Sequence, residues 1–84
     1  MISTLMSFRR AIEWRPRTMW IEFREMPGQP IRVVYFLEHV PFVRFKGVDT
    51  EALFEVRAGQ YGKTWRCWDE EPAAADMAAE PWDD

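Results

Sequence analysis

The sequence TMWIEFREMPGQPIRVVYFL, residues 18–37, contains the clearest structural pattern of this chain. From residue 18 to 24 apolar and polar side chains alternate, which is the period of a strand with one buried face. Residues 27–30 have the prolines and glycine of a turn, and residues 31–37 are β-branched or aromatic at nearly every position. We therefore expect a β-hairpin whose second strand lies in the middle of a sheet.

Three more strands and one helix extend this pattern in both directions. Residues 42–46 follow a proline and predict a third strand, while residues 54–58 and 63–68 alternate again. The turn residues at 59–62 predict that the last two strands form a second hairpin. Apolar residues at helical spacing over residues 3–13 predict a short helix. Together these segments predict an α+β domain or a small open barrel, with about five mostly antiparallel strands and one short N-terminal helix.

The length and composition limit the class of protein. The 84 residues are 48% hydrophobic and 15% aromatic, which suffices for one domain with a small aromatic core and excludes a repeat array or a multidomain enzyme. The chain has no apolar run long enough to cross a membrane, no secretory leader pattern and one cysteine. We expect a soluble intracellular protein without disulfides or a membrane partner.

Charge is divided unequally along the chain. The net charge is −3, yet residues 1–68 hold all 11 lysines and arginines against 7 acids, whereas residues 69–84 hold 7 acids and no base. The second segment is rich in alanine and proline and has few side chains that can pack. We expect a single α+β domain over residues 1–68 and an acidic, weakly structured tail over residues 69–84. One or two helical turns are expected between Pro72 and Pro81.

Few groups suit catalysis or metal binding. A structural zinc site needs several cysteine and histidine ligands, and the chain has only Cys67 and His39. We expect Cys67 to be a buried core residue and His39 to lie at the surface near a strand end. The glycines occur at turns rather than in a phosphate-binding loop, and so small a body leaves little room for a substrate pocket. The sequence therefore predicts no enzyme activity, no catalytic residue, no metal and no cofactor.

The acidic tail is the first candidate interaction surface. Its spaced carboxylates surround two apolar anchors, Met77 and Trp82, which suits a basic groove on a protein or nucleoprotein partner. A tail that only increases solubility explains the same composition and stays open as an alternative. The predicted partner-binding residues are Asp69, Glu70, Glu71, Asp76, Glu80, Trp82, Asp83 and Asp84.

A second candidate surface combines arginine and tryptophan on one face of the sheet. Arginines beside stacking aromatic rings are typical of proteins that bind single-stranded nucleic acid. The same pattern also shields an aromatic sheet from water without binding anything, and the body's excess of four positive charges is modest. In this alternative function the nucleic-acid-binding residues are Trp20, Arg24, Arg44, Arg66 and Trp68.

The end of the chain has a distinctive order of residues: Gly-Lys-Thr-Trp-Arg-Cys-Trp at 62–68, Pro72, Met77 and Pro81-Trp82. With these residues it resembles the ends of short uncharacterised proteins encoded by phages and prophages. The resemblance covers about the last quarter of the chain and implies no assigned activity. After the proline, three alanines replace the polar helix start that is typical of those proteins.

By analogy with small acidic phage proteins of the anti-CRISPR type, the resemblance suggests a non-enzymatic inhibitor. Such a protein would act in the cytoplasm of a bacterial host, where it would bind a protein or nucleoprotein complex and obstruct the handling of nucleic acid. The expected edge strand and exposed aromatic residues also make a homodimer reasonable.

Overall fold

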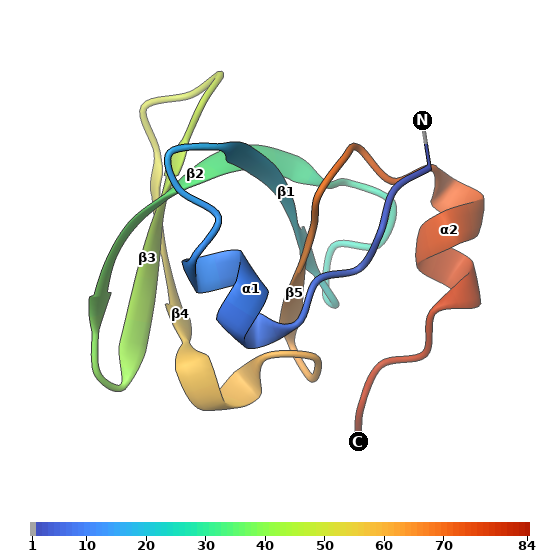
Figure 1. Cartoon of the computed structure of the whole chain (residues 1–84). Coiled ribbons are helices and arrows are strands. Elements are labelled where there is room, and N and C mark those ends of the chain that lie inside the picture. Colours follow the sequence, from blue (N-terminus) through green and yellow to red (C-terminus); the bar gives the residue numbers. More distant parts are fainter. Residues whose placement is uncertain (1) are drawn as a thin grey trace.

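One antiparallel sheet of five strands organises the computed structural model, which describes residues 2–84 (Figure 1). The strand order is β4-β3-β2-β1-β5. This confirms the predicted α+β fold with about five strands and an N-terminal helix. The elements are α1 (Phe8–Ile12), β1 (Thr18–Phe23), β2 (Ile31–His39), β3 (Phe42–Gly47), β4 (Leu53–Arg57), the short 3₁₀ helix η1 (Ala58–Gln60), β5 (Trp65–Trp68) and α2 (Ala74–Ala79).

The predicted first hairpin is present. Strand β1 pairs with β2 over the register from Thr18 opposite Val34 to Ile21 opposite Ile31. The turn between them contains Gly28 at φ +76°, a left-handed conformation that glycine adopts without a steric penalty. Strands β2, β3 and β4 then follow as a meander in which each strand pairs with the next along the chain.

The predicted second hairpin is wrong, because β4 and β5 lie at opposite edges of the sheet. Strand β5 pairs instead with β1, with Trp65 opposite Phe23. The connection through η1 crosses from one edge to the other, and the Trp65 indole donates a 2.7 Å hydrogen bond to the Arg57 carbonyl oxygen on β4. Alternation identified both strands correctly, but an alternating pattern does not specify which strand is the neighbour.

The main core lies on one face of the sheet, beneath α1. Its buried side chains come from all five strands, and the Phe45 and Trp65 rings meet edge-on with their centres 5.5 Å apart. The rings of Phe23 on β1 and Phe54 on β4 are 6.0 Å apart although their strands are not neighbours. The sheet is therefore curled toward an open barrel, with its seam between the β4 and β5 edges. The buried core residues are Met6, Ala11, Met19, Ile21, Val33, Val43, Phe45, Val56, Trp65 and Cys67.

Helix α1 is shorter than the predicted helix over residues 3–13. It begins after Ser7, whose hydroxyl accepts a 3.2 Å hydrogen bond from the Arg10 amide. The preceding residues run alongside β5: the Met6 amide donates to the Cys67 carbonyl oxygen at 2.9 Å and the Asp69 amide to that of Thr4 at 3.1 Å. The start of the chain thus covers the outer edge of β5.

No helix within residues 2–84 is long and apolar enough to span a lipid bilayer. The longer of the two α-helices, α2, has six residues.

Candidate functional site

A buried ion pair occupies the sheet face opposite the main core. Residues 22 and 66 are opposite each other on β1 and β5, and Arg66 Nε donates to Glu22 Oε1 at 2.8 Å. The indole nitrogen of Trp68 donates to the same carboxylate oxygen at 2.9 Å. The side chains of Arg66 and Glu22 are 1% and 3% exposed, so this pair is removed from water.

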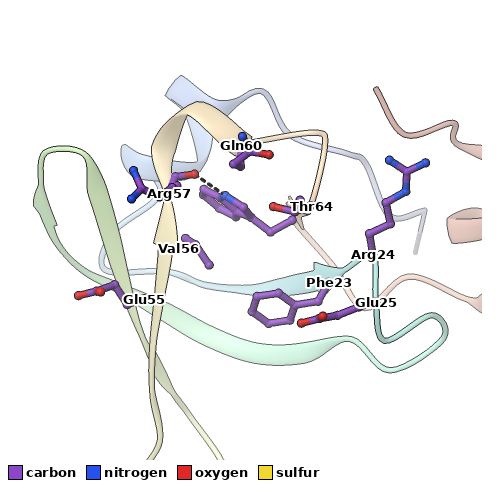
Figure 2. Close-up of a pocket in the computed structure, with 9 residues that line it drawn as sticks. Phe23, Arg24, Glu25, Glu55, Val56, Arg57, Gln60 and Thr64 are labelled. Carbon is purple, nitrogen blue, oxygen red and sulfur yellow. Dashed lines mark hydrogen bonds between the residues drawn. The ribbon is translucent and has the colours of Figure 1, made fainter. Parts of the chain in front are cut away.

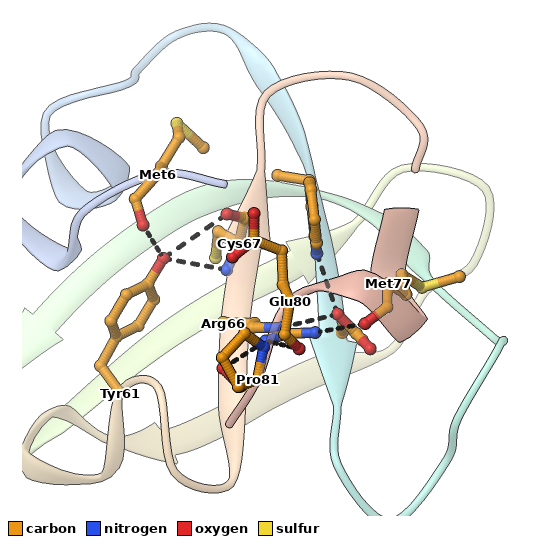
Figure 3. Close-up of polar contacts among 9 residues, drawn as sticks. Met6, Tyr61, Arg66, Cys67, Met77, Glu80 and Pro81 are labelled. Atoms are coloured by element: carbon orange, nitrogen blue, oxygen red, sulfur yellow. Dashed lines mark hydrogen bonds and ion pairs between the residues drawn. The ribbon is translucent and has the colours of Figure 1, made fainter. Parts of the chain in front are cut away.

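The C-terminal end of α2 closes over this pair. Arg66 Nη2 donates to the Met77 carbonyl oxygen at 3.0 Å, and Nη1 donates to those of Glu80 and Pro81 at 3.2 and 3.3 Å (Figure 3). The last carbonyl groups of a helix lack partners within the helix and carry partial negative charge, so a guanidinium group satisfies and stabilises them. Arg66 therefore caps α2. Its guanidinium carbon also lies 4.0 Å from the centre of the Trp82 ring.

Hydrogen bonds to the N-terminal residues also hold the start of the same segment. The Thr4 amide donates to the Asp69 carboxylate at 2.6 Å, and Asp76 accepts from the Ser3 hydroxyl and from the Ala73 amide at 3.1 and 3.0 Å. Pro72 and Met77 are buried. The expectation of a weakly structured tail over residues 69–84 is thus not confirmed: the segment is packed on the body, because Arg66 and a small apolar cluster hold it there.

The predicted partner-binding acids divide into two groups. Asp69 and Asp76 bind the chain's own N–H and O–H groups, and Asp84 forms a 3.5 Å ion pair with Arg24 at the surface. Within residues 2–84 no hydrogen bond or ion pair engages the other four carboxylates, two of which precede α2 and two of which follow it. We call these four the acidic face; the first two line a pocket with Arg17 and Arg32. The residues of the acidic face are Glu70, Glu71, Glu80 and Asp83.

Trp82 does not lie free as the predicted apolar anchor. It is half-buried, with its ring against Arg66 and 6.0 Å from the guanidinium carbon of Arg24. Its role in the structure is to cover Arg66, so a partner reaches only part of the ring.

The alternative nucleic-acid-binding set is not one open surface, which corrects that prediction. Arg66 and Trp68 are 1% and 2% exposed, and α2 and the residues after it cover Arg66. Arg24 donates to the carbonyl oxygens of Lys63 and Asp83 at 3.3 Å. Of the five predicted residues, Trp20 is half-buried on β1, and Arg44 on β3 pairs with Glu55 at 2.8 Å.

A cluster of arginines lies outside the five residues that the sequence predicted for nucleic-acid binding. The guanidinium carbons of Arg10 and Arg17 lie 4.7 and 3.9 Å from the Trp14 ring centre, and that of Arg15 lies 5.1 Å from the Tyr35 ring centre. These arginines cover aromatic rings beside α1. This agrees with the alternative interpretation, in which arginines shield aromatic side chains from water without binding a ligand. The short run Arg15-Pro16-Arg17 next to Trp14 is the signal that locates them.

Cys67 is a core residue, as predicted. It is fully buried, and burial raises the pKa of its thiol. Its amide donates to the Tyr61 hydroxyl at 3.1 Å, and that hydroxyl donates to the Met6 carbonyl oxygen at 2.5 Å (Figure 3). Burial and the adjacent Cys67 raise the Tyr61 pKa. His39 is exposed at the end of β2, and residues 2–84 contain no cluster of three or more metal-ligating side chains.

A groove lies along the seam of the sheet, contrary to the expectation that the body has little room for a pocket. Its volume is about 540 Å³. Phe23, Val56 and Trp65 provide its apolar floor, and Gln60 and Thr64 add polar groups (Figure 2). It forms because the curled sheet leaves its β4 and β5 edges apart.

The fold and this surface define a small α+β domain with an acidic segment fastened across one sheet face. No protein-family model matches the chain, and comparisons with curated proteins and with solved structures find no match. Its function is therefore argued from its own residues.

Proposed function

We propose that the protein is a non-enzymatic binding module whose acidic face docks on a basic surface of a partner. The observation that carries this proposal is the way Arg66 holds residues 69–84. It binds three backbone carbonyl oxygens of the segment and none of its carboxylates. The segment is fixed in place, and within residues 2–84 no hydrogen bond or ion pair engages the four carboxylates of the acidic face, although Glu70 and Glu71 share a pocket with Arg17 and Arg32.

A fixed acidic surface loses less conformational entropy on binding than a free acidic tail does. A disordered segment loses conformational entropy when it docks, whereas residues 69–84 are already ordered by α2 and its contacts. Carboxylates at fixed positions also favour one orientation of a basic partner over others and raise the rate of encounter. Both effects suit recognition of a particular basic site rather than of any polycation.

The partner proposed is a protein or nucleoprotein complex of a bacterial host with a basic groove that handles nucleic acid. The excess of negative charge on this segment and its resemblance to the ends of phage proteins support that choice. An acidic module in such a groove would occupy the place of phosphate groups, as an anti-CRISPR-type inhibitor does.

The test compares two triple variants of equal charge. In the first, Glu70, Glu71 and Glu80 are replaced by glutamine; in the control, Glu38→Gln, Asp49→Asn and Glu51→Gln neutralise three exposed acids elsewhere. Partners are captured from a bacterial lysate on immobilised wild-type protein and on each variant, and the captured proteins are identified by mass spectrometry.

We expect a protein captured by the wild type and by the control, lost from the first variant, and released as salt is raised because salt screens exposed charges. Once that partner is purified, the wild type is expected to bind it at least about tenfold more tightly than the first variant does, a difference of about 1.4 kcal/mol. Equal capture by both variants would exclude the acidic face as the docking surface.

A further inference from the structure

Strand β4 forms one edge of the sheet, and within residues 2–84 the Arg57 carbonyl oxygen is the one outward backbone group of this edge that has a hydrogen-bond partner. Two hydrogen bonds flank the pairing of β4 with β3. The Gly47 amide donates to the Ala52 carbonyl oxygen at 2.9 Å, and the Ala58 amide donates to the Pro41 carbonyl oxygen at 2.9 Å. In an antiparallel pair the residues that bond to the neighbour alternate with residues that bond outward. Residues 53, 55 and 57 therefore turn their N–H and C=O groups away from β3. The Arg57 carbonyl oxygen, which accepts from the Trp65 indole, shows this direction.

The opposite edge of the sheet is covered. Along β5 the outward carbonyl oxygen of Cys67 accepts from the Met6 amide, and the outward amide of Cys67 donates to the Tyr61 hydroxyl. Within residues 2–84, β4 is therefore the edge left available for another strand. Exposed edges of this kind are ready templates for strand pairing.

The side chains of β4 separate into two sets at this edge. The Val56 side chain points toward Trp65 and Phe23 in the seam groove, whereas the side chains of Glu55 and Arg57 extend to the other side of β4 (Figure 2). Parts of both charged residues still line the groove. Leu53, on the same side as Glu55, is 59% exposed. An added strand would thus meet an apolar groove on one face and a carboxylate, a guanidinium group and an apolar side chain on the other.

The charges on β4 are complementary to those of the same strand running in the opposite direction. When two copies are aligned antiparallel about Val56, Glu55 of each lies opposite Arg57 of the other. This register also places outward-bonding residues opposite each other, as a hydrogen-bonded pair requires. The register centred on Glu55 satisfies the same bonding rule, but it sets two carboxylates face to face.

We propose that β4 pairs with β4 of a second copy of this chain across a two-fold axis at Val56, so that two sheets become one continuous sheet. Each Val56 then enters the mouth of the other copy's groove, and each Glu55 contacts the other copy's Arg57. Leu53 is covered beside Gly59 of the other copy, where the space for a β-carbon is empty. In an isologous contact of this kind each residue pair away from the two-fold axis occurs twice by symmetry.

Charge reversal and its rescue test this pairing. We expect the wild type to show a concentration-dependent monomer–dimer equilibrium in sedimentation velocity. Glu55→Arg and Arg57→Glu each place like charges opposite one another twice per dimer, and each is expected to weaken dimerisation about tenfold or more. The double variant restores both opposite-charge pairs and is expected to return the dissociation constant to within about threefold of the wild-type value.

Two controls separate the proposal from changes in folding or net charge. Glu51→Arg changes the charge as Glu55→Arg does, at an exposed residue just before β4, and should leave the dimer intact. Circular dichroism melting checks that each variant is folded, which matters because Glu55 also pairs with Arg44. A wild type that stays monomeric up to its solubility limit overturns the proposal. A dimer that both single reversals leave unchanged, or that the double variant fails to restore, also overturns it.

Discussion

The Nε atom of Arg66 lies 2.8 Å from Oε1 of Glu22, and both side chains are almost fully buried. A buried ion pair gains little over an apolar pair of the same size, but the removal of one partner leaves an uncompensated charge. In this protein the arginine also closes the carbonyl end of α2. The pair therefore connects two strands and the acidic segment through one guanidinium group.

Arg66→Met is expected to lower the free energy of unfolding by about 3–5 kcal/mol, because Glu22 is left charged, buried and unpaired. The double variant that also carries Glu22→Gln should be more stable than Arg66→Met alone, since no isolated charge remains. Urea unfolding followed by circular dichroism measures both. Glu13→Gln is the control: its pair with Arg9 is exposed, so the expected change is within about 0.5 kcal/mol. A loss of the same small size at Arg66 would contradict this account.

Met77→Ala tests the apolar contact that holds α2. Met77 is 6% exposed, and its truncation is expected to cost about 2–3 kcal/mol. Met26→Ala is the matched control, because Met26 is 38% exposed and its loss should cost less than about 0.5 kcal/mol. Equal unfolding midpoints for the two variants in urea would mean that α2 does not pack on the sheet in solution.

Alternation, β-branched and aromatic composition, and turn residues were together sufficient to predict the strands. Thr18–Phe23 and Ile31–His39 form the expected hairpin because a two-residue period and a proline–glycine turn act locally. The partner of β5 was beyond that reasoning, since the pairing of Trp65 with Phe23 joins residues far apart in the chain. The pattern of residues within a short segment gives no information about such a long-range contact.

The candidate site was harder to predict for a related reason. Arg66 occupies the polar position of an alternating strand, so the pattern placed it in water. What buries it is a segment whose composition favours disorder, rich in alanine and acids. Three residues hold this segment on the sheet: Pro72, Met77 and Trp82. They are too few to show a period, and their packing depends on Arg66 beneath them.

The burial of Cys67 and Tyr61 leads us to expect a lower free energy of unfolding at alkaline pH. Burial is the first cause of the raised pKa of both groups, whose ordinary values are 9.0 and 10.0. The folded protein keeps protons that the unfolded chain releases, so the stabilising contribution is complete below these ordinary values and decreases as the pH rises above them. The free energy of unfolding should therefore fall from about pH 9 upward.

Cys67→Ala should flatten the first part of this decline, which urea unfolding across the alkaline range measures. In the native protein the Cys67 thiol should also resist a thiol-specific reagent and react once denaturant unfolds the chain. Rapid labelling of the native protein, or an alkaline decline that Cys67→Ala leaves unchanged, would contradict the burial of this thiol.

Deletion of residues 69–84 is expected to destabilise the domain as well as remove seven acids. It exposes the Glu22–Arg66 pair to water, and it removes the contacts of Met77 and Trp82. We expect a lower urea midpoint for the shortened chain and a partial recovery when a synthetic peptide of residues 69–84 is added, because the peptide restores those contacts. A peptide with Trp82→Ala should restore less. If the shortened chain unfolds at the same urea concentration as the full chain, the segment contributes charge alone and its order in the folded protein has no energetic consequence.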